Sequence, residues 1–143
     1  MFFIALTKKK IQKSLIYSYL NKKFIRLNSL SKFIMPENVK NKGDVQPIKF
    51  LKGVYRRTLV FDDNLMMCHF ILSKNAEIPL HNHKENQIGY IIKGKLKFMT
   101  EHRNFICKDG DSYIFESNEK HGAVILEDSE VIDVFNPARE DYK

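Results

Sequence analysis

The chain has 143 residues, a length typical of one domain and sufficient to bury a hydrophobic core. Its formal net charge of +7 would by itself favour a nucleic-acid or membrane partner. Residues 1–34, however, hold eight basic residues and no acidic one, so residues 35–143 keep 16 basic residues against 17 acidic ones. The excess positive charge belongs to the N-terminal part, and we expect no nucleic-acid partner for the rest of the chain.

Residues 1–34 are interpreted as a basic N-terminal extension with helical character, because Ile11, Leu15, Ile16, Tyr19 and Leu20 recur at helical spacing. Three interpretations stay open: a helix on a membrane surface, an organellar transit segment, or an extension upstream of a true start at Met35. We favour the third, because the composition changes at Met35 to that of an ordinary soluble domain. The extension is the only hint of a membrane, so no firm membrane partner is expected.

Short runs rich in β-branched and aromatic residues follow one another from residue 54 onward, which predicts an all-β fold, either a sandwich or a barrel. Turn signals separate the runs at 62–64, 93–94, 109–110 and 127–129, and the Lys93-Gly94 pair has the composition of a hairpin turn. The predicted strands are Val54–Phe61, Leu65–Leu72, Gln87–Ile92, Lys95–Thr100, Asn104–Cys107, Ser112–Phe115, Ala123–Leu126 and Glu130–Phe135.

Cys68 and Cys107 are far apart and form no Cys-x-x-Cys motif, so we predict buried, reduced thiols and a cytoplasmic location. His69 lies inside a predicted strand, where it is expected to pack or to face outward and not to bind a metal. His102 is predicted to be a turn residue.

His81 and His83, with Gln87 four residues later, form the most informative motif of the chain. Side chains two residues apart share one face of a strand, so both imidazoles are predicted to reach one ion. Imidazole suits first-row transition metals, and the amide oxygen of glutamine is a neutral, hard ligand. A bare His-x-His is also compatible with two surface histidines near a turn, so the motif needs support from elsewhere in the sequence.

That support lies downstream, where Gly110-Asp111 opens a short strand and His121 stands between a polar loop and an apolar run. A histidine in that position is able to supply a further ligand from a different strand. With His81, His83, Gln87 and Gly94 as a first motif and these residues as a second, the chain resembles the cupin superfamily. Glu116 and Asn118 occupy loop positions where the second motif usually carries Pro and Gly.

The resemblance implies a single-domain jelly-roll β-barrel, or double-stranded β-helix, over residues 35–143. It also implies a divalent transition metal (Ni, Fe, Mn, Zn or Co) held by His81, His83, Gln87 and His121. Cupins of this size often form homodimers, so a homodimer is expected from the resemblance as well.

The segment 131–142 resembles the ending of the small KdgF-type pectin-degradation cupins, and the likeness extends over residues 53–142. The residues that line the active site in that group correspond here to Asp133, Phe135 and Arg139. The residues alone leave other interpretations open: a water-facing or ion-paired Asp133, a core Phe135 and a surface Arg139. Asp133 shares a strand face with Val131 and Phe135, and a carboxylate in such a partly desolvated position is suited to proton transfer.

The resemblance implies an enzyme that converts cyclic 4,5-unsaturated monouronates, from pectin or alginate breakdown, to linear ketonised 4-deoxy-5-keto uronates. The ligand set fits, because three neutral imidazoles and a neutral amide leave the charge of the ion uncompensated, which favours an anionic sugar acid as the small-molecule partner. Arg139 is expected to bind the carboxylate of that substrate in a fork. The alternatives are an oxygen-dependent dioxygenase and a non-catalytic sugar-binding or sensing module.

Overall fold

The computed structural model describes residues 38–143, and one compact unit spans Lys40–Lys143. The basic extension 1–34 and its predicted boundary with the domain lie outside these residues. The elements, in chain order, are η1 (Lys42–Asp44), β1 (Ile48–Leu51), β2 (Val54–Phe61), β3 (Met66–Leu72), β4 (Glu77–His81), β5 (Asn86–Thr100), β6 (Asn104–Lys108), β7 (Ser112–Phe115), β8 (His121–Asn136) and η2 (Glu140–Tyr142). Among the described residues, no helix has the length and apolar character needed to cross a membrane.

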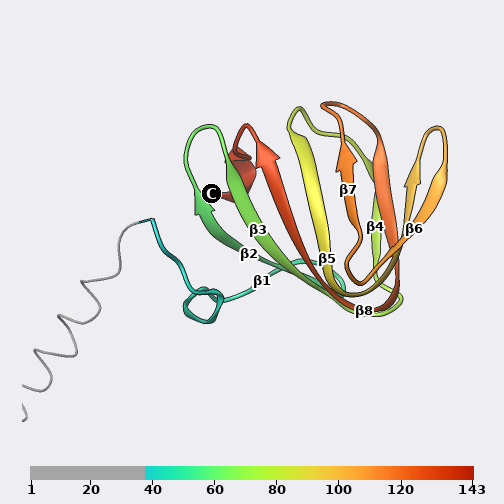
Figure 1. The fold of residues 1–143 in the computed structure, drawn as a ribbon, viewed down its shortest axis with the longest axis horizontal. Helices are drawn as coiled ribbons and strands as arrows, with labels where there is room; N and C mark the ends of the chain where they lie inside the picture. Colours follow the sequence, from blue (N-terminus) through green and yellow to red (C-terminus); the bar gives the residue numbers. More distant parts are fainter. Residues whose placement is uncertain (1–37) are drawn as a thin grey trace, which may run out of the picture. The chain divides into compact units, whose positions relative to one another are not determined.

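The unit is an all-β jelly roll in which two long strands belong to two sheets at once. The second half of β8 pairs with β3, and the first half of β5 pairs with both β8 and β7, which gives the order β1-β2-β3-β8-β5-β7. The first half of β8 pairs with β4, and the second half of β5 pairs with β6, which gives the order β4-β8-β5-β6. Figure 1 shows β8, in orange to red, turning at the lower edge of the view as it passes between the sheets.

The predicted turns at Lys93-Gly94 and 127–129 are wrong, because β5 and β8 run through both positions. The two strands instead bend there together, with three register shifts between Ile91 and Leu96. Bulges of this kind let a strand change sheets without ending. Gly94 has φ +99°, and a Cβ atom at this residue would lie 2.1 Å from Ser129 Oγ. Glycine is therefore needed at position 94 because two strands cross closely there. A hairpin turn requires the same kind of residue, so the sequence does not distinguish the two structures.

Four predicted strands are confirmed to within a residue at each end: Val54–Phe61, Leu65–Leu72, Asn104–Cys107 and Ser112–Phe115. The other four are parts of β5 and β8, and β1 and β4 are additional strands that the pattern did not predict. β4 contains Pro79, and β1 has no fully buried residue, so neither shows the apolar alternation of a typical strand. Cys68 and Cys107 are buried free thiols, as predicted, and His102 lies in the bend between β5 and β6.

The core lies between the sheets and is filled by alternate residues of the strands. β5 shows this most clearly, because Gln87, Gly89 and Ile91 are buried and Ile88 and Tyr90 are exposed. On β8, Val131, Asp133 and Phe135 face the same interior, as their spacing predicts. Gln87 and Asp133 are therefore polar side chains within a largely apolar interior.

On the opposite face of β3, the predicted packed position of His69 is confirmed, since its side chain is 1% exposed. Arg57 Nη1 donates to His69 Nδ1 over 3.2 Å, so the other ring nitrogen, Nε2, donates to Glu130 Oε2 over 3.1 Å. Lys93 and Lys42 reach the same carboxylate, at 2.9 and 3.3 Å. Hydrogen bonds from Lys93 and His69 lower the pKa of Glu130 to about 2.

We predict that Glu130→Gln lowers the free energy of unfolding at pH 7 by about 1–3 kcal/mol, because the donors around it lose a charged acceptor. Since the pKa of Glu130 is lowered on folding, its contribution is complete above pH 4.5 and disappears as the pH falls towards 2. Urea unfolding of both proteins from pH 7 to pH 3 measures this difference. Glu101→Gln, which breaks an exposed ion pair with Lys120, serves as the control and is expected to change little. A Glu130→Gln effect that is the same at every pH would contradict the prediction.

Candidate metal centre and adjoining pocket

Three histidines come together at one end of the interior. His81 is the last residue of β4 and pairs with His121, the first residue of β8, while His83 follows β4. One ring nitrogen from each of the three lies within 4.8 Å of the others. This separation allows one ion to contact all three, and it joins the two sequence motifs as predicted.

Backbone carbonyls fix two of the three imidazoles. His81 Nδ1 lies 2.8 Å from the Pro79 carbonyl oxygen, and His121 Nδ1 lies 2.8 Å from that of Glu119. A carbonyl only accepts, so both Nδ1 atoms carry the proton and both Nε2 atoms keep a free lone pair. The ring of His121 also stacks on Phe115, with a centroid distance of 4.1 Å. Both rings are therefore held in the tautomer and orientation that a metal ligand needs.

His83 differs from the prediction, because β4 ends at His81 and His83 lies in the loop that follows. The two histidines thus converge through a turn of the backbone and not through a shared strand face. The backbone N–H of Asn118 donates to the His83 carbonyl over 2.7 Å, which ties this loop to the one before β8. Asn118 has φ +64°, a left-handed conformation that asparagine tolerates better than most residues, so it fills the position of the family's glycine.

Burial favours the neutral form of His121 and His83. It lowers the pKa of His121 to about 4, and it also lowers the pKa of His83, with the charge of Arg139 acting in the same direction. His83 Nδ1 is buried without a hydrogen bond, and a carboxylate oxygen of the buried Glu85 lies 3.5 Å away. Neutral imidazole is the form that binds a metal.

Gln87, on β5, connects the histidines with the rest of the interior. Its Oε1 atom lies 3.2 Å from His83 Nε2, so the amide oxygen faces the imidazole cluster. Its amide also lies close enough to Asp133 to lower the pKa of that carboxyl by a hydrogen bond. With its oxygen on one side and its nitrogen on the other, Gln87 is placed to act as a fourth ligand and to hold Asp133.

Asp133 is buried, and the hydroxyl of Tyr113 donates to its Oδ1 atom over 2.6 Å. Burial raises the pKa of Asp133 to about 6, although the hydrogen bonds from Tyr113 and Gln87 oppose the rise. Gly89 lies between the two residues in the sheet, opposite Asp133 on β8 and Tyr113 on β7. A Cβ atom at Gly89 would lie 2.0 Å from the Tyr113 ring, so only glycine lets the tyrosine cross over β5 to the carboxylate.

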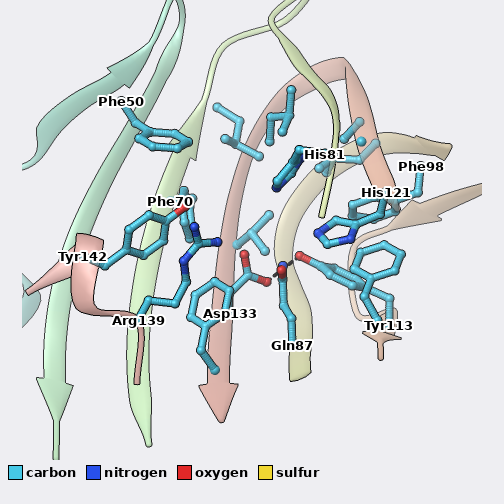
Figure 2. A pocket seen from close by; sticks show the side chains of 18 residues that line it. Phe50, Phe70, His81, Gln87, Phe98, Tyr113, His121, Asp133, Arg139 and Tyr142 are labelled. Carbon is cyan, nitrogen blue, oxygen red and sulfur yellow. Dashed lines mark hydrogen bonds between the residues drawn. The ribbon is translucent and has the colours of Figure 1, made fainter. Parts of the chain in front are cut away.

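A pocket extends from the histidines past Asp133 to the C-terminal segment. Figure 2 shows His81 and His121 on one side of it, Arg139 and Tyr142 on the other, and Asp133 and Gln87 between them. Arg139 donates from Nε and Nη2 to the carboxylate of Asp141, and its side chain is 11% exposed. The pocket thus has a candidate ligand cluster at one end and a cation at the other.

The predicted site residues therefore lie close together, around one pocket. His81, Gln87, His121, Asp133, Phe135 and Arg139 all line the pocket, and His83 belongs to the histidine cluster. Phe135 is fully buried, and its ring meets the ring of His83 edge-on, with 5.8 Å between the ring centroids. It is thus a core residue that also forms part of the pocket wall.

Tyr113 and Glu85 were not predicted as site residues. Tyr113 looks like an ordinary core residue, because it alternates with Phe115 on a short apolar strand. Only the pairing of β7 with β5 shows that its hydroxyl meets Asp133. Glu85 lies two residues after His83 in a polar loop, and nothing in its sequence context distinguishes it from a solvated acid.

The donor atoms at this end of the pocket fit a divalent transition metal. Two imidazoles present unprotonated Nε2 atoms, a third lies within reach, and the oxygen of Gln87 approaches from β5. His83 Nδ1 remains buried without a hydrogen bond, and binding an ion through the other nitrogen would orient its N–H towards Glu85.

Comparison with known proteins agrees with this architecture. The family model for the cupin domain matches residues 68–135. The chain is 37% identical to the pectin degradation protein KdgF of Dickeya dadantii (strain 3937) over 92 residues, which is 63% of this chain and 84% of that protein.

Two solved structures are similar over most of their length. KdgF from Halomonas sp. has a TM-score of 0.70 and 28% identity, covering 73% of this chain and 99% of that one. An RmlC-like cupin from Shewanella frigidimarina NCIMB 400 has a TM-score of 0.72 and 28% identity, covering 76% and 97%.

We predict that the protein binds one divalent transition metal per chain and that His121→Ala reduces metal occupancy by at least about tenfold, because it removes a buried, pre-oriented ligand. Metal content after dialysis against Ni²⁺ or Mn²⁺ measures the occupancy, and metal is expected to raise the melting temperature of the unaltered protein. His102→Ala, in the bend between β5 and β6, is the matched control and should leave occupancy unchanged. Equal occupancy in both variants would exclude the histidine cluster as the metal site.

We also predict that Gly89→Ala lowers the free energy of unfolding by about 1–3 kcal/mol, because the added methyl group overlaps the ring of Tyr113. Displacing the ring would also separate its hydroxyl from Asp133. Urea unfolding gives the first effect, and the near-ultraviolet circular dichroism of tyrosine gives the second. Gly43→Ala, in the exposed η1 turn, is the control and should alter neither. A Gly89→Ala protein as stable as the control variant would show that the interior accommodates the methyl group.

Proposed function

Because this chain belongs to the cupin family and is homologous to the KdgF pectin degradation proteins, we propose that it converts cyclic 4,5-unsaturated monouronates to linear 4-deoxy-5-keto uronates. The observation that carries the proposal is the position of Asp133 in the pocket. This carboxylate lies between the histidine cluster and Arg139, and it is buried and hydrogen-bonded by Tyr113. A binding module would need no proton-transfer group at this place, whereas an isomerase needs one.

The proposed reaction is an isomerisation, so its proton balance is simple. The hydroxyl on C1 loses its proton, the bond between C1 and the ring oxygen breaks, and C1 becomes an aldehyde. The ring oxygen stays on C5, where the C4–C5 double bond makes it an enolate. The enolate becomes a ketone when C4 gains the proton that the C1 hydroxyl lost. No electrons enter or leave.

One carboxylate is able to carry out both proton transfers of this reaction. Asp133 in its ionised form accepts the proton of the C1 hydroxyl and, once protonated, delivers a proton to C4. Its raised pKa, about 6, places both forms within reach near neutral pH. Tyr113 and Gln87 hold the carboxyl group in one orientation, so that the same oxygen can take up and release the proton.

Other residues of the pocket are suited to binding the sugar acid. Arg139 offers a guanidinium at the end opposite the histidines, and such a group binds carboxylates through paired hydrogen bonds. A metal ion held by His81, His83, His121 and Gln87 would polarise the oxygen atoms of the bound sugar acid. The burial of Phe135 and Phe115 beside the cluster limits the access of water.

We predict that the metal-loaded protein removes the ultraviolet absorbance of the double bond in unsaturated galacturonate, and that a chelator suppresses this activity. Asp133→Asn should lower kcat by about 10²–10⁴-fold, because it keeps the shape but cannot accept a proton. Its metal content should be unchanged, which separates loss of proton transfer from loss of the site. Asp44→Asn removes an exposed carboxylate in η1 and is the control.

The outcomes distinguish the competing functions. Full activity of Asp133→Asn would exclude the role assigned to this residue. Absence of any turnover by the metal-loaded protein would contradict the proposed reaction. Oxygen uptake with a small-molecule substrate would instead identify a dioxygenase.

A further inference from the structure

Arg56 is a buried cation that the site described above does not use. It lies on the inward face of β2, between the buried Val54 and the partly buried Thr58, and is 4% exposed. Its Nε and Nη1 atoms are buried and have no hydrogen-bond acceptor among the described residues. Burying a charge without a hydrogen-bonded partner costs several kcal/mol, and replacing buried charged residues by apolar ones is often neutral or stabilising. The presence of arginine therefore requires a reason other than stability.

The group that receives the charge of Arg56 is an aromatic ring. The guanidinium carbon of Arg56 lies 3.6 Å from the centroid of the Tyr142 ring and 5.9 Å from that of Phe50. Cation–π contacts of this kind contribute about 2 kcal/mol when they are shielded from water. Tyr142 is itself fixed at the backbone, since Thr58 Oγ1 donates to its carbonyl oxygen over 2.7 Å. The contact thus anchors the C-terminal turn η2 against β2.

The same ring carries a second guanidinium. The guanidinium carbon of Arg139 lies 4.0 Å from the centroid of the Tyr142 ring, and Figure 2 shows the two side chains next to each other at the end of the pocket opposite His121. Asp141 accepts from Nε and Nη2 of Arg139, while Nη1 makes no hydrogen bond to any described residue. Both Arg56 and Arg139 therefore contact the ring of Tyr142, and the carboxylate of Asp141 forms hydrogen bonds with Arg139 alone.

We propose that Arg56 is a positioning residue that sets the specificity of the pocket for a carboxylate-bearing sugar. Through the ring of Tyr142 it holds Arg139 with Nη1 available to the pocket, and its own charge adds to the positive potential at that end. Arg56 is not among the residues that line the pocket, so it acts through Tyr142. The choice of an unsaturated uronate as substrate rests on the proposed function, whereas the preference for a carboxylate rests on the two arginines.

The test compares an acidic sugar with its neutral counterpart in the full-length, metal-loaded protein. Calorimetry with galacturonate and with galactose measures the preference for the carboxylate without any turnover. Arg56→Met should weaken galacturonate binding by on the order of tenfold and leave galactose binding unchanged, because only the charged interaction is removed. Arg56→Lys keeps the charge and should recover part of the preference. Arg103→Met, which removes an exposed arginine over Phe105, is the matched control and should behave like the unaltered protein.

With unsaturated galacturonate as substrate, Arg56→Met should raise KM by a similar factor and leave kcat within about twofold, the signature of lost binding. Tyr142→Leu removes the ring between the two arginines and should have the same effect. If Arg56→Met does not fold, Arg56→Lys and Tyr142→Leu decide the question.

An unchanged preference for galacturonate in these variants would overturn the role of Arg56, even if the enzyme turns over the uronate normally. A clear preference that Arg56→Met abolishes, in a protein that never turns over unsaturated uronates, would support the role of Arg56 and contradict the proposed reaction.

Discussion

The pairing of β5 with β8 is the interaction on which the rest of this structure depends. The two strands stay in register from Asn86 opposite Asn136 to Thr100 opposite His121, apart from the bulges at the bend. That single ladder places Gln87 next to Phe135, Gly89 next to Asp133, and His121 at the far end beside β4. The pocket lies between the sheets that these two strands connect, so the geometry of the site is a direct consequence of their bending at Gly94.

The cost of the site is the burial of polar groups, and the structure compensates for most of it locally. The carbonyl oxygens of Pro79 and Glu119 accept hydrogen bonds from two imidazoles, and the Tyr113 hydroxyl donates to one oxygen of Asp133. Gln87 forms hydrogen bonds with both His83 and Asp133. Arg56 and the Nδ1 atom of His83 are exceptions among the described residues. Buried groups that lack a partner call for an explanation. Here one belongs to the histidine cluster at one end of the pocket, and the other contacts Tyr142 at the opposite end.

Much of this arrangement is predictable from the sequence, because its determinants are local. The alternation on β5 and β8 predicts which residues face inward, and the spacing of the histidines with Gln87 predicts a shared ligand cluster. Asp133 is singled out by the family resemblance, because the residues alone also allow a water-facing or ion-paired carboxylate. The charges of residues 35–143 nearly cancel once residues 1–34 are set apart, so the absence of a nucleic-acid partner stays a prediction from the sequence.

The remaining features depend on contacts between distant parts of the chain. Gly94 and Ser129 resemble turn residues because a strand crossing and a hairpin both require small or flexible residues, and only the pairing distinguishes them. His83 reaches the cluster through a loop that Asn118 holds from 35 residues away. Tyr113 and Arg56 have the spacing of core residues, and their roles appear only when Asp133 and Tyr142 are placed beside them.

The central claim is that the pocket directs a proton to one carbon of an unsaturated uronate. Nuclear magnetic resonance of the product formed in deuterated water tests it most directly, because the reaction places one solvent-derived hydrogen on C4. If Asp133 delivers that hydrogen from a fixed position, a single deuterium will occupy one of the two stereochemical positions at C4. A product with deuterium equally distributed over both positions, formed no faster than without protein, would contradict the account.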